Sequence, residues 1–169
     1  QALLLAAKFA KVDSKTTRYA TYAEITGHAA FTILTAMAVW FWQERTLILD
    51  AAFQSYLFVA DGSPAIMVER FGAAMVQLLP LVGVWAGASL KTVLILYSVS
   101  IVLFHWVFFG VCLYVLKDKK AALAILLFNV LLVGDSFYWM QNELLQAIAL
   151  MFALWSLWMR RGDWSQFTK

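Results

Sequence analysis

The sequence has few charged residues and almost no cysteine. Charged side chains make up only 14% of its 169 residues, whereas 63% are hydrophobic. An ordinary globular domain has roughly a quarter charged and half apolar residues. The single cysteine, Cys112, excludes an internal disulfide. A chain of this composition has too little polar surface for an ordinary water-soluble domain, so we expect most of it to lie in lipid.

The motifs of several large enzyme classes are also missing. The chain contains no zinc-ligand spacing, P-loop, dinucleotide-binding glycine motif or nucleophile elbow. Its formal net charge is +3. In a membrane protein a small basic excess is typical of cytoplasmic loops, so this charge does not indicate a nucleic-acid partner.

Apolar stretches are what the sequence has in abundance. A membrane-spanning helix needs about 20 predominantly apolar residues. Five stretches are candidates: 25–43, 71–88, 92–116, 121–141 and 144–159. The second of these is short, and it contains Pro80, Gln77 and several glycines. The sequence therefore predicts an all-α, polytopic membrane protein.

The positions of lysine and arginine favour four spans over five, because cytoplasmic loops are enriched in these residues. If all five stretches cross, the better orientation places eight of the 13 basic residues inside. If 71–88 stays outside, ten are inside, and only Arg45, Arg70 and Lys91 are outside. We therefore predict four transmembrane helices plus an outer-side interfacial or re-entrant helix, with both termini cytoplasmic.

This topology divides the chain into three regions. Residues 1–24 form a cytoplasmic or interfacial N-terminal segment. Residues 25–161 form the transmembrane domain, which includes an outer loop over residues 44–91, and residues 162–169 form a cytoplasmic tail. We expect the protein to lie in an inner or plasma membrane, in contact with membrane lipid.

Two acidic residues on the predicted outer side are candidates for catalysis and for metal binding. Asp50 follows the first span, and Glu143 precedes the last one. A carboxylate just outside a span can act as a general base or bind a divalent metal beside a phosphate. The alternatives are a solvated acid on an interfacial helix for Asp50 and a helix-start acid for Glu143. In the latter case Asn142 would be the N-cap, and the helix dipole would favour the negative charge.

Three basic side chains have two interpretations each. Lys91 and Arg70 could bind a lipid phosphate on the outer side. Alternatively, Lys91 is a snorkelling lysine, and Arg70 pairs with the adjacent Glu69. His105 lies mid-span among aromatic residues, where it could ligate haem or a chlorin magnesium. It could also form a hydrogen bond with a neighbouring helix.

The order of these features resembles the N-terminal half of the GT-C class of membrane glycosyltransferases, which use polyprenyl-phosphate sugars. The matching features are a first span and an outer loop with an early acid. They continue with the basic helix start "GASLKTV", the inner hairpin "LKDKKAALAILLF" and the outer acid of "WMQNELLQAIALMFALWSLWMRR". The resemblance covers residues 25–161. Alanine follows Asp50, where the family commonly has a second acid, and family members have more than four spans.

The resemblance implies that a sugar is transferred from a lipid-phosphate donor on the outer side of the membrane. It assigns the role of catalytic base or metal ligand to Asp50, and it places Glu143 near the donor or metal. Lys91 or Arg70 would neutralise the phosphate leaving group, and Mg²⁺ or Mn²⁺ is the expected cofactor.

Two other functions remain open. A non-catalytic structural subunit of a larger membrane complex would use its aromatic spans to contact other membrane subunits, lipid, pigment or haem, with His105 as the ligand. A transporter fragment would use Asp135, Glu143 and the proline-containing stretch 71–88, which is similar to the discontinuous helices of transporters.

Overall fold

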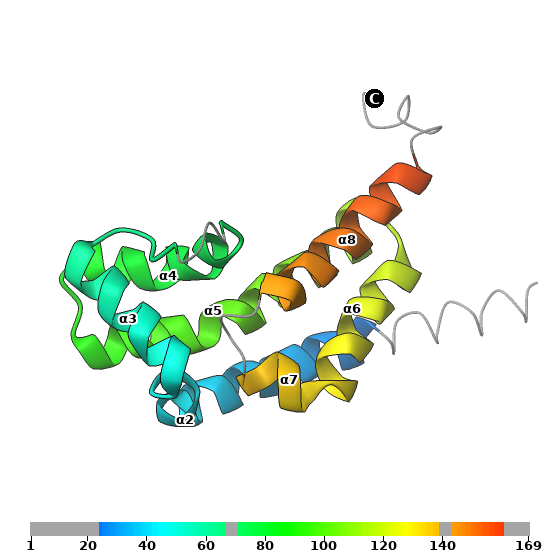
Figure 1. Ribbon diagram of the computed structural model, residues 1–169. Helices are drawn as coiled ribbons and strands as arrows, with labels where there is room; N and C mark the ends of the chain where they lie inside the picture. Colours follow the sequence, from blue (N-terminus) through cyan, green and yellow to red (C-terminus); the bar gives the residue numbers. More distant parts are fainter. Residues whose placement is uncertain (1–23, 67–70, 139–142, 161–169) are drawn as a thin grey trace, which may run out of the picture.

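The regular secondary structure of the described chain is helical throughout (Figure 1). The computed structural model describes residues 24–66, 71–138 and 143–160, and these ranges contain no strand. Residues 24–40 are helical, and in chain order they are followed by α2 (Trp42–Thr46), α3 (Leu49–Asp61), α4 (Ala73–Trp85), α5 (Leu90–Gly110), the π-helical segment η1 (Val111–Val115), α6 (Lys119–Leu131), α7 (Val133–Tyr138) and α8 (Glu143–Met159). The prediction of an all-α chain is confirmed. The predicted tail 162–169 and nearly all of the predicted N-terminal segment lie outside the described residues.

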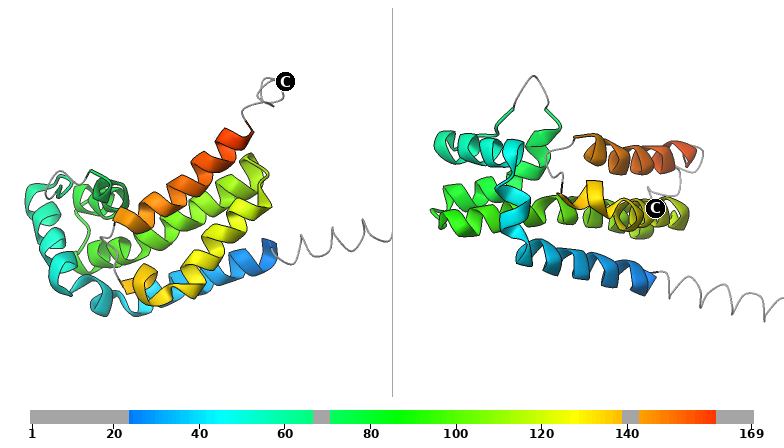
Figure 2. Two further views of the ribbon diagram at one scale, coloured as in Figure 1. Left: turned by 45° about the vertical axis from the view of Figure 1, so that its right-hand side comes forward. Right: turned by 60° about the horizontal axis from the view of Figure 1, so that its bottom comes forward.

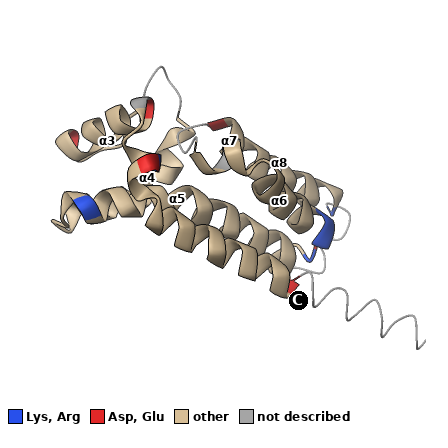
Figure 3. Cartoon of the chain, turned by 90° about the horizontal axis from the view of Figure 1, so that it is seen from below, with Lys and Arg blue, Asp and Glu red and all other residues tan. Residues whose placement is uncertain are grey.

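α5 is the longest helix and forms the axis of the bundle. Together with η1 it makes a continuous helix, Leu90–Val115, of 26 residues, which is about 39 Å long at 1.5 Å per residue. Within the described ranges it is the one helix long and apolar enough to cross a membrane. It begins at Ser89, whose hydroxyl accepts a hydrogen bond from the Thr92 N–H at 3.3 Å, as an N-cap does. Apart from Lys91 in the first turn, it carries no charged side chain (Figure 3).

Helix 24–40 packs antiparallel to α5. Near its start, Glu24 accepts a hydrogen bond from the Tyr114 hydroxyl of η1 at 2.7 Å. Near its end, the carbonyl of Ala38 accepts one from the Ser98 hydroxyl, also at 2.7 Å. In the right-hand view of Figure 2, this helix and α8 lie on opposite sides of α5.

α8 runs parallel to the second half of α5. The Leu145 carbonyl near its start lies 3.1 Å from His105 Nε2. Just beyond its end, Arg160 Nη2 donates to the Lys117 carbonyl at 3.2 Å. α8 therefore begins part-way along α5, at the depth of His105.

α4 folds back on the first half of α5 as an antiparallel hairpin. Gly83 allows the close approach, because a Cβ there would lie 2.8 Å from Leu96 Cδ1. The connecting turn passes through Gly87, whose φ of +68° favours glycine. α4 has 13 residues and is about 20 Å long, so it is too short to cross a hydrocarbon core of about 30 Å on its own.

α3 packs across the first half of α5 through one polar and one aromatic contact. The Tyr97 hydroxyl of α5 donates to Gln54 Oε1 of α3 at 2.8 Å. One helical turn further along α3, the Phe58 ring meets the Tyr97 ring edge to face, with 5.2 Å between centroids. These contacts fix α3 beside α5 and create the groove described below.

The long helix ends in the π-helical segment η1. The Leu116 N–H donates to the Val111 carbonyl, five residues back, at 2.9 Å, and the Asp118 N–H donates to the Cys112 carbonyl at 2.7 Å. Asp118 then caps α6, because its Oδ1 accepts hydrogen bonds from two backbone N–H groups of the first turn at 3.0 and 3.1 Å. The direction of the chain thus reverses within a few residues.

Candidate functional site

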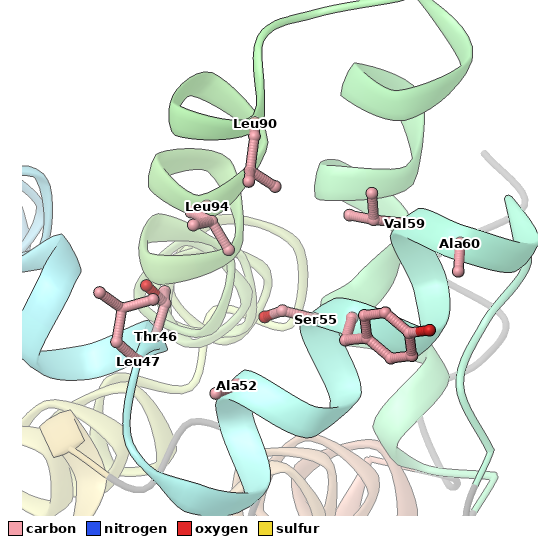
Figure 4. A pocket seen from close by; sticks show the side chains of 9 residues that line it. Thr46, Leu47, Ala52, Ser55, Val59, Ala60, Leu90 and Leu94 are labelled. Atoms are coloured by element: carbon pink, nitrogen blue, oxygen red, sulfur yellow. The ribbon is translucent and has the colours of Figure 1, made fainter.

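An apolar groove of about 420 Å³ lies between α3, the end of α2 and the start of α5 (Figure 4). Leu90 and Leu94 of α5 form one wall. The opposite wall is α3, and the end of α2 closes one side; their lining residues are Thr46, Leu47, Ala52, Ser55, Tyr56, Val59 and Ala60. The groove exists because α3 crosses α5 at Tyr97, one turn beyond Leu94.

The two aliphatic hydroxyl groups in the groove form hydrogen bonds within their own helices. Thr46 Oγ1 donates to the Trp42 carbonyl, and Ser55 Oγ donates to the Ala51 carbonyl, both at 2.7 Å. Each donor is therefore satisfied by its own helix, and the groove wall is left predominantly hydrocarbon. Such a surface suits an apolar chain and does not suit a sugar or a charged group.

Asp50 and Lys91 both lie next to residues that line the groove. Asp50 is exposed in the first turn of α3, two residues before Ala52. Lys91 is exposed in the first turn of α5, directly after Leu90. Neither side chain lines the groove: Asp50 lies about 200° around α3 from Ala52 and so faces away from it, and Lys91 lies about 100° around α5 from Leu90. An acid in a first helical turn is also favoured by the helix dipole, so the solvated-acid interpretation of Asp50 fits the same position.

Glu143 lies elsewhere. It is half-buried in the first turn of α8, and its Cγ would lie 3.3 Å from a Cβ placed on Gly72, the residue before α4. Since α8 begins at the depth of His105, roughly three helical turns separate Glu143 from Leu94 along α5. Glu143 thus lies where α4 and α8 both begin, and two helix N-termini favour a negative charge there. This position fits the helix-start interpretation and separates Glu143 from Lys91.

The remaining predicted residues of the outer side are only partly visible. Arg70, its neighbour Glu69 and Asn142 lie outside the described residues. Asp135 belongs to α7, but its side chain is likewise outside the description. In the ranges 24–66, 71–138 and 143–160, no group of three or more His, Cys, Asp or Glu side chains is arranged to hold a metal ion.

His105 is fully buried, and both its ring nitrogens face backbone carbonyls. Nδ1 lies 2.9 Å from the Ile101 carbonyl of its own helix, and Nε2 lies 3.1 Å from the Leu145 carbonyl of α8. A metal ligand needs a nitrogen lone pair directed at open space. In this conformation the ring instead joins α5 to α8, as the hydrogen-bonding alternative predicts.

Arg45 is the buried charge to which the sequence analysis gave no role. Its side chain is 0% exposed. Nε donates to Ser98 Oγ at 2.9 Å, Nη2 donates to the Ser98 carbonyl at 2.7 Å, and the guanidinium carbon lies 3.8 Å above the Phe137 ring of α7. Nη1 is buried and has no hydrogen-bond partner within the described part of the chain. Burial lowers the pKa of Arg45 to about 9, which leaves it charged at neutral pH.

Arg45 holds the end of α2 against α5. Thr46 and Leu47, which line the groove, follow it directly, and Ser98 lies one turn beyond Leu94. The arginine therefore fixes one side of the groove from behind. The local sequence signal was an arginine just after an apolar run, but its partner on α5 is 53 positions away and cannot be identified by spacing.

A second polar cluster joins helix 24–40 to the far end of α5. Trp106 Nε1 lies 2.8 Å from His28 Nδ1, and His28 Nε2 lies 2.7 Å from the Tyr114 hydroxyl. That hydroxyl donates in turn to Glu24 Oε1 at 2.7 Å. No sequence pattern indicates this cluster, because its members lie up to 90 positions apart.

Comparison with known proteins leaves this geometry as the main guide to function. No family model, curated protein or solved structure matches the chain. The features that bear on function are therefore the groove and the distribution of basic residues along the helices.

Proposed function

We propose that this chain is a membrane-embedded glycosyltransferase of the GT-C type, or the N-terminal part of one, which takes its sugar from a polyprenyl-phosphate donor on the outer side of the membrane. The observation that carries the proposal is the apolar groove, whose lining residue Leu90 is followed directly by the exposed Lys91. A polyprenyl-phosphate donor combines a long hydrocarbon chain with an anionic head, and the groove and Lys91 offer one surface for each.

The proposed topology has four spans: helix 24–40, α5 with η1, α6 with α7, and α8. The distribution of charge supports it. Lys117, Lys119, Lys120 and Arg160 gather at one end of α5, whereas Lys91 lies at the other. The positive-inside rule then assigns the first end to the cytoplasm. α4, which is too short to cross, would lie on the outer side with the groove.

In the proposed reaction, the isoprenoid chain lies along the groove and Lys91 neutralises the donor phosphate. Asp50 takes a proton from the acceptor hydroxyl, whose oxygen forms a bond to the anomeric carbon. The bond from that carbon to the phosphate oxygen breaks, and the lipid phosphate leaves. Fixed charge near a departing phosphate is most effective where water is scarce. Mg²⁺ or Mn²⁺ at Asp50 would neutralise the same phosphate.

The roles of the other predicted residues follow from their positions. Glu143 is assigned a structural role at the start of α8, away from the groove. Its negative charge interacts favourably with the helix dipoles there. Arg45 is a positioning residue, because it holds the groove wall at Thr46 and Leu47 without lining the groove itself.

Asp50→Asn tests the proposal directly. Membranes containing the full chain would be supplied with polyprenyl-phosphate hexoses and pentoses, and transfer of radiolabelled sugar to membrane acceptors would be measured. We expect transfer to fall about 100-fold or more, as is typical when a general base is removed. The matched control is Asp61→Asn, which changes another exposed acid at the opposite end of α3, and it should leave transfer within about twofold of the unmodified chain.

Full transfer by Asp50→Asn would exclude Asp50 as the base. A complete lack of transfer by the unmodified chain with every donor would favour the alternative, a non-catalytic subunit of a membrane complex. That alternative has its own observation. An open apolar hollow on α8 has a volume of about 550 Å³ and is lined by Ala147, Leu150, Met151, Leu154, Trp155 and Trp158. Such a surface suits another membrane helix or lipid.

A further inference from the structure

The cluster of Trp106, His28, Tyr114 and Glu24 is a hydrogen-bond chain with a fixed direction. An indole N–H can only donate, so Trp106 Nε1 donates to His28 Nδ1 at 2.8 Å. A neutral imidazole has one N–H, and it must therefore be on Nε2. This N–H donates to the Tyr114 oxygen at 2.7 Å, and the Tyr114 hydroxyl donates to Glu24. Both ring nitrogens of His28 therefore have a hydrogen-bond partner when the ring is neutral, and one of them would lose its partner if the ring were protonated.

The same four side chains join the start of helix 24–40 to the end of α5 and η1. The His28 ring also meets the Phe109 ring edge to face, with 5.3 Å between centroids. Phe31, one turn further along, stacks on Trp106, with 6.1 Å between centroids. The hydrogen bond to His28 therefore holds Trp106 in a position where it also packs against helix 24–40.

A proton on Nδ1 would break this arrangement at one bond. The imidazolium would direct an N–H at the indole N–H, so the two donors would repel each other and Trp106 would lose its acceptor. The bond from Nε2 to Tyr114 would remain, because the phenol oxygen accepts from either form of the ring. Protonation therefore acts on Trp106 selectively and spares the Tyr114–Glu24 side.

We propose that His28 is a proton-controlled latch between helix 24–40 and α5: the neutral ring holds Trp106, and protonation releases it. The latch lies at the end of the bundle opposite to the groove and is independent of the proposed glycosyl transfer. His28 is partly exposed and Tyr114 is exposed, and the cluster lies at the end of α5 that is followed by Lys117, Lys119 and Lys120.

Charged groups of both signs lie near His28. On its own helix, Glu24 accepts a hydrogen bond from the Tyr114 hydroxyl of η1, which in turn lies 2.7 Å from His28 Nε2. From α6, Lys119 shares with Glu24 the wall of a cavity of about 30 Å³. Asp118 lies in the turn before α6 between Lys117 and Lys119, and Lys120 follows them. Along the adjoining turn of α5, Trp106 and Phe109 contribute aromatic rings and no charge.

Nuclear magnetic resonance of the full chain in detergent micelles tests the latch. Tryptophan would be labelled with ¹⁵N at the indole, and Trp106→Phe would identify the signal of Trp106. Histidine rings would be labelled with ¹³C, and the pH would be lowered from about 8 to about 5, the range in which histidine ordinarily titrates. We expect the Trp106 indole proton signal to move upfield as its hydrogen bond is lost, with the same midpoint as the His28 ring.

Two variants separate the latch from a general effect of pH. His28→Gln retains His105, and we expect its Trp106 signal to stay in place over this range. Tyr114→Phe keeps the Trp106–His28 bond but disconnects Glu24, so we expect its Trp106 signal still to move upfield. It also serves as the second test if His28→Gln does not fold. A Trp106 signal that stays fixed in the unmodified chain from pH 8 to pH 5, or that moves equally in His28→Gln, overturns the proposal.

Discussion

Gly27→Ala should destabilise the packing of helix 24–40 against α5. A Cβ on Gly27 would meet the Phe109 ring, with Cε2 at 3.0 Å and Cζ nearer still. The ring is itself held between Phe31 and His28, with centroids at 5.3 Å from each, so it has little freedom to retreat. An added carbon in a well-packed core costs about 1–3 kcal/mol, and exchanging glycine for alanine in a helix returns about 0.5–1 kcal/mol. We therefore expect a net loss of up to about 2.5 kcal/mol.

The measurement is the free energy of unfolding of the purified chain in mixed detergent micelles. Gly134→Ala is the matched control, because a Cβ on Gly134 in α7 would meet nothing within 4 Å; it should stabilise the protein by about 0.5–1 kcal/mol through helix propensity alone. Phe109→Leu in the Gly27→Ala background should recover part of the loss, because residues in contact do not act additively. If Gly27→Ala were as stable as Gly134→Ala, the close packing of Gly27 on Phe109 would be refuted.

Two further predictions concern the start of α6 and the topology. Asp118→Ala removes the N-cap of α6 and should cost about 1 kcal/mol in the same unfolding assay. Burial alone would raise the pKa of Asp118, but the N–H groups of Ala121 and Lys120 and the charge of Arg160 lower it overall. The stabilisation is therefore present above the unfolded pKa of about 3.9 and is lost as the pH falls through the lower folded value. Loss on raising the pH instead would contradict this assignment. For the topology, Ala88→Cys in a Cys112→Ala background should react with an impermeant thiol reagent added outside intact spheroplasts. Labelling only after lysis would mean that residues 71–88 cross the membrane.

Two features could be predicted from sequence because they depend on local properties: the helical fold, and the poor suitability of residues 71–88 as a membrane span. Apolar runs with few charges predict helices, and Pro80 with Gln77 indicated that 71–88 differs from the other runs. The structure shows what Gln77 does: its amide oxygen accepts from the Ala65 N–H at 2.7 Å, and its amide nitrogen donates to the Ala65 carbonyl at 3.2 Å. No periodicity indicates that a buried glutamine will pair with a loop 12 positions earlier.

In the candidate site, too, local sequence features could be predicted and contacts between distant residues could not. Asp50 and Lys91 could be singled out because a charge beside an apolar run is visible locally, but neither lines the groove, and their roles stay a prediction. Arg45 carried the same local signal, yet its role depends on Ser98, 53 positions away. The Trp106–His28 bond joins residues 78 positions apart. Such pairs are determined by how the helices are aligned and not by any pattern within a helix.

The π-helical segment η1 determines where this chain can change in length. Its turn holds one residue more than an α-helical turn, as the bond from the Leu116 N–H to the carbonyl five residues back shows. Removing one residue of η1 other than Tyr114 would convert the segment to an α-helix and leave the start of α6 nearly in place. Removing one residue between His105 and Gly110 would instead rotate everything after it by about 100° and carry Tyr114 away from His28. Related chains should therefore differ by single-residue insertions or deletions at η1 and keep a constant length in the helix before it.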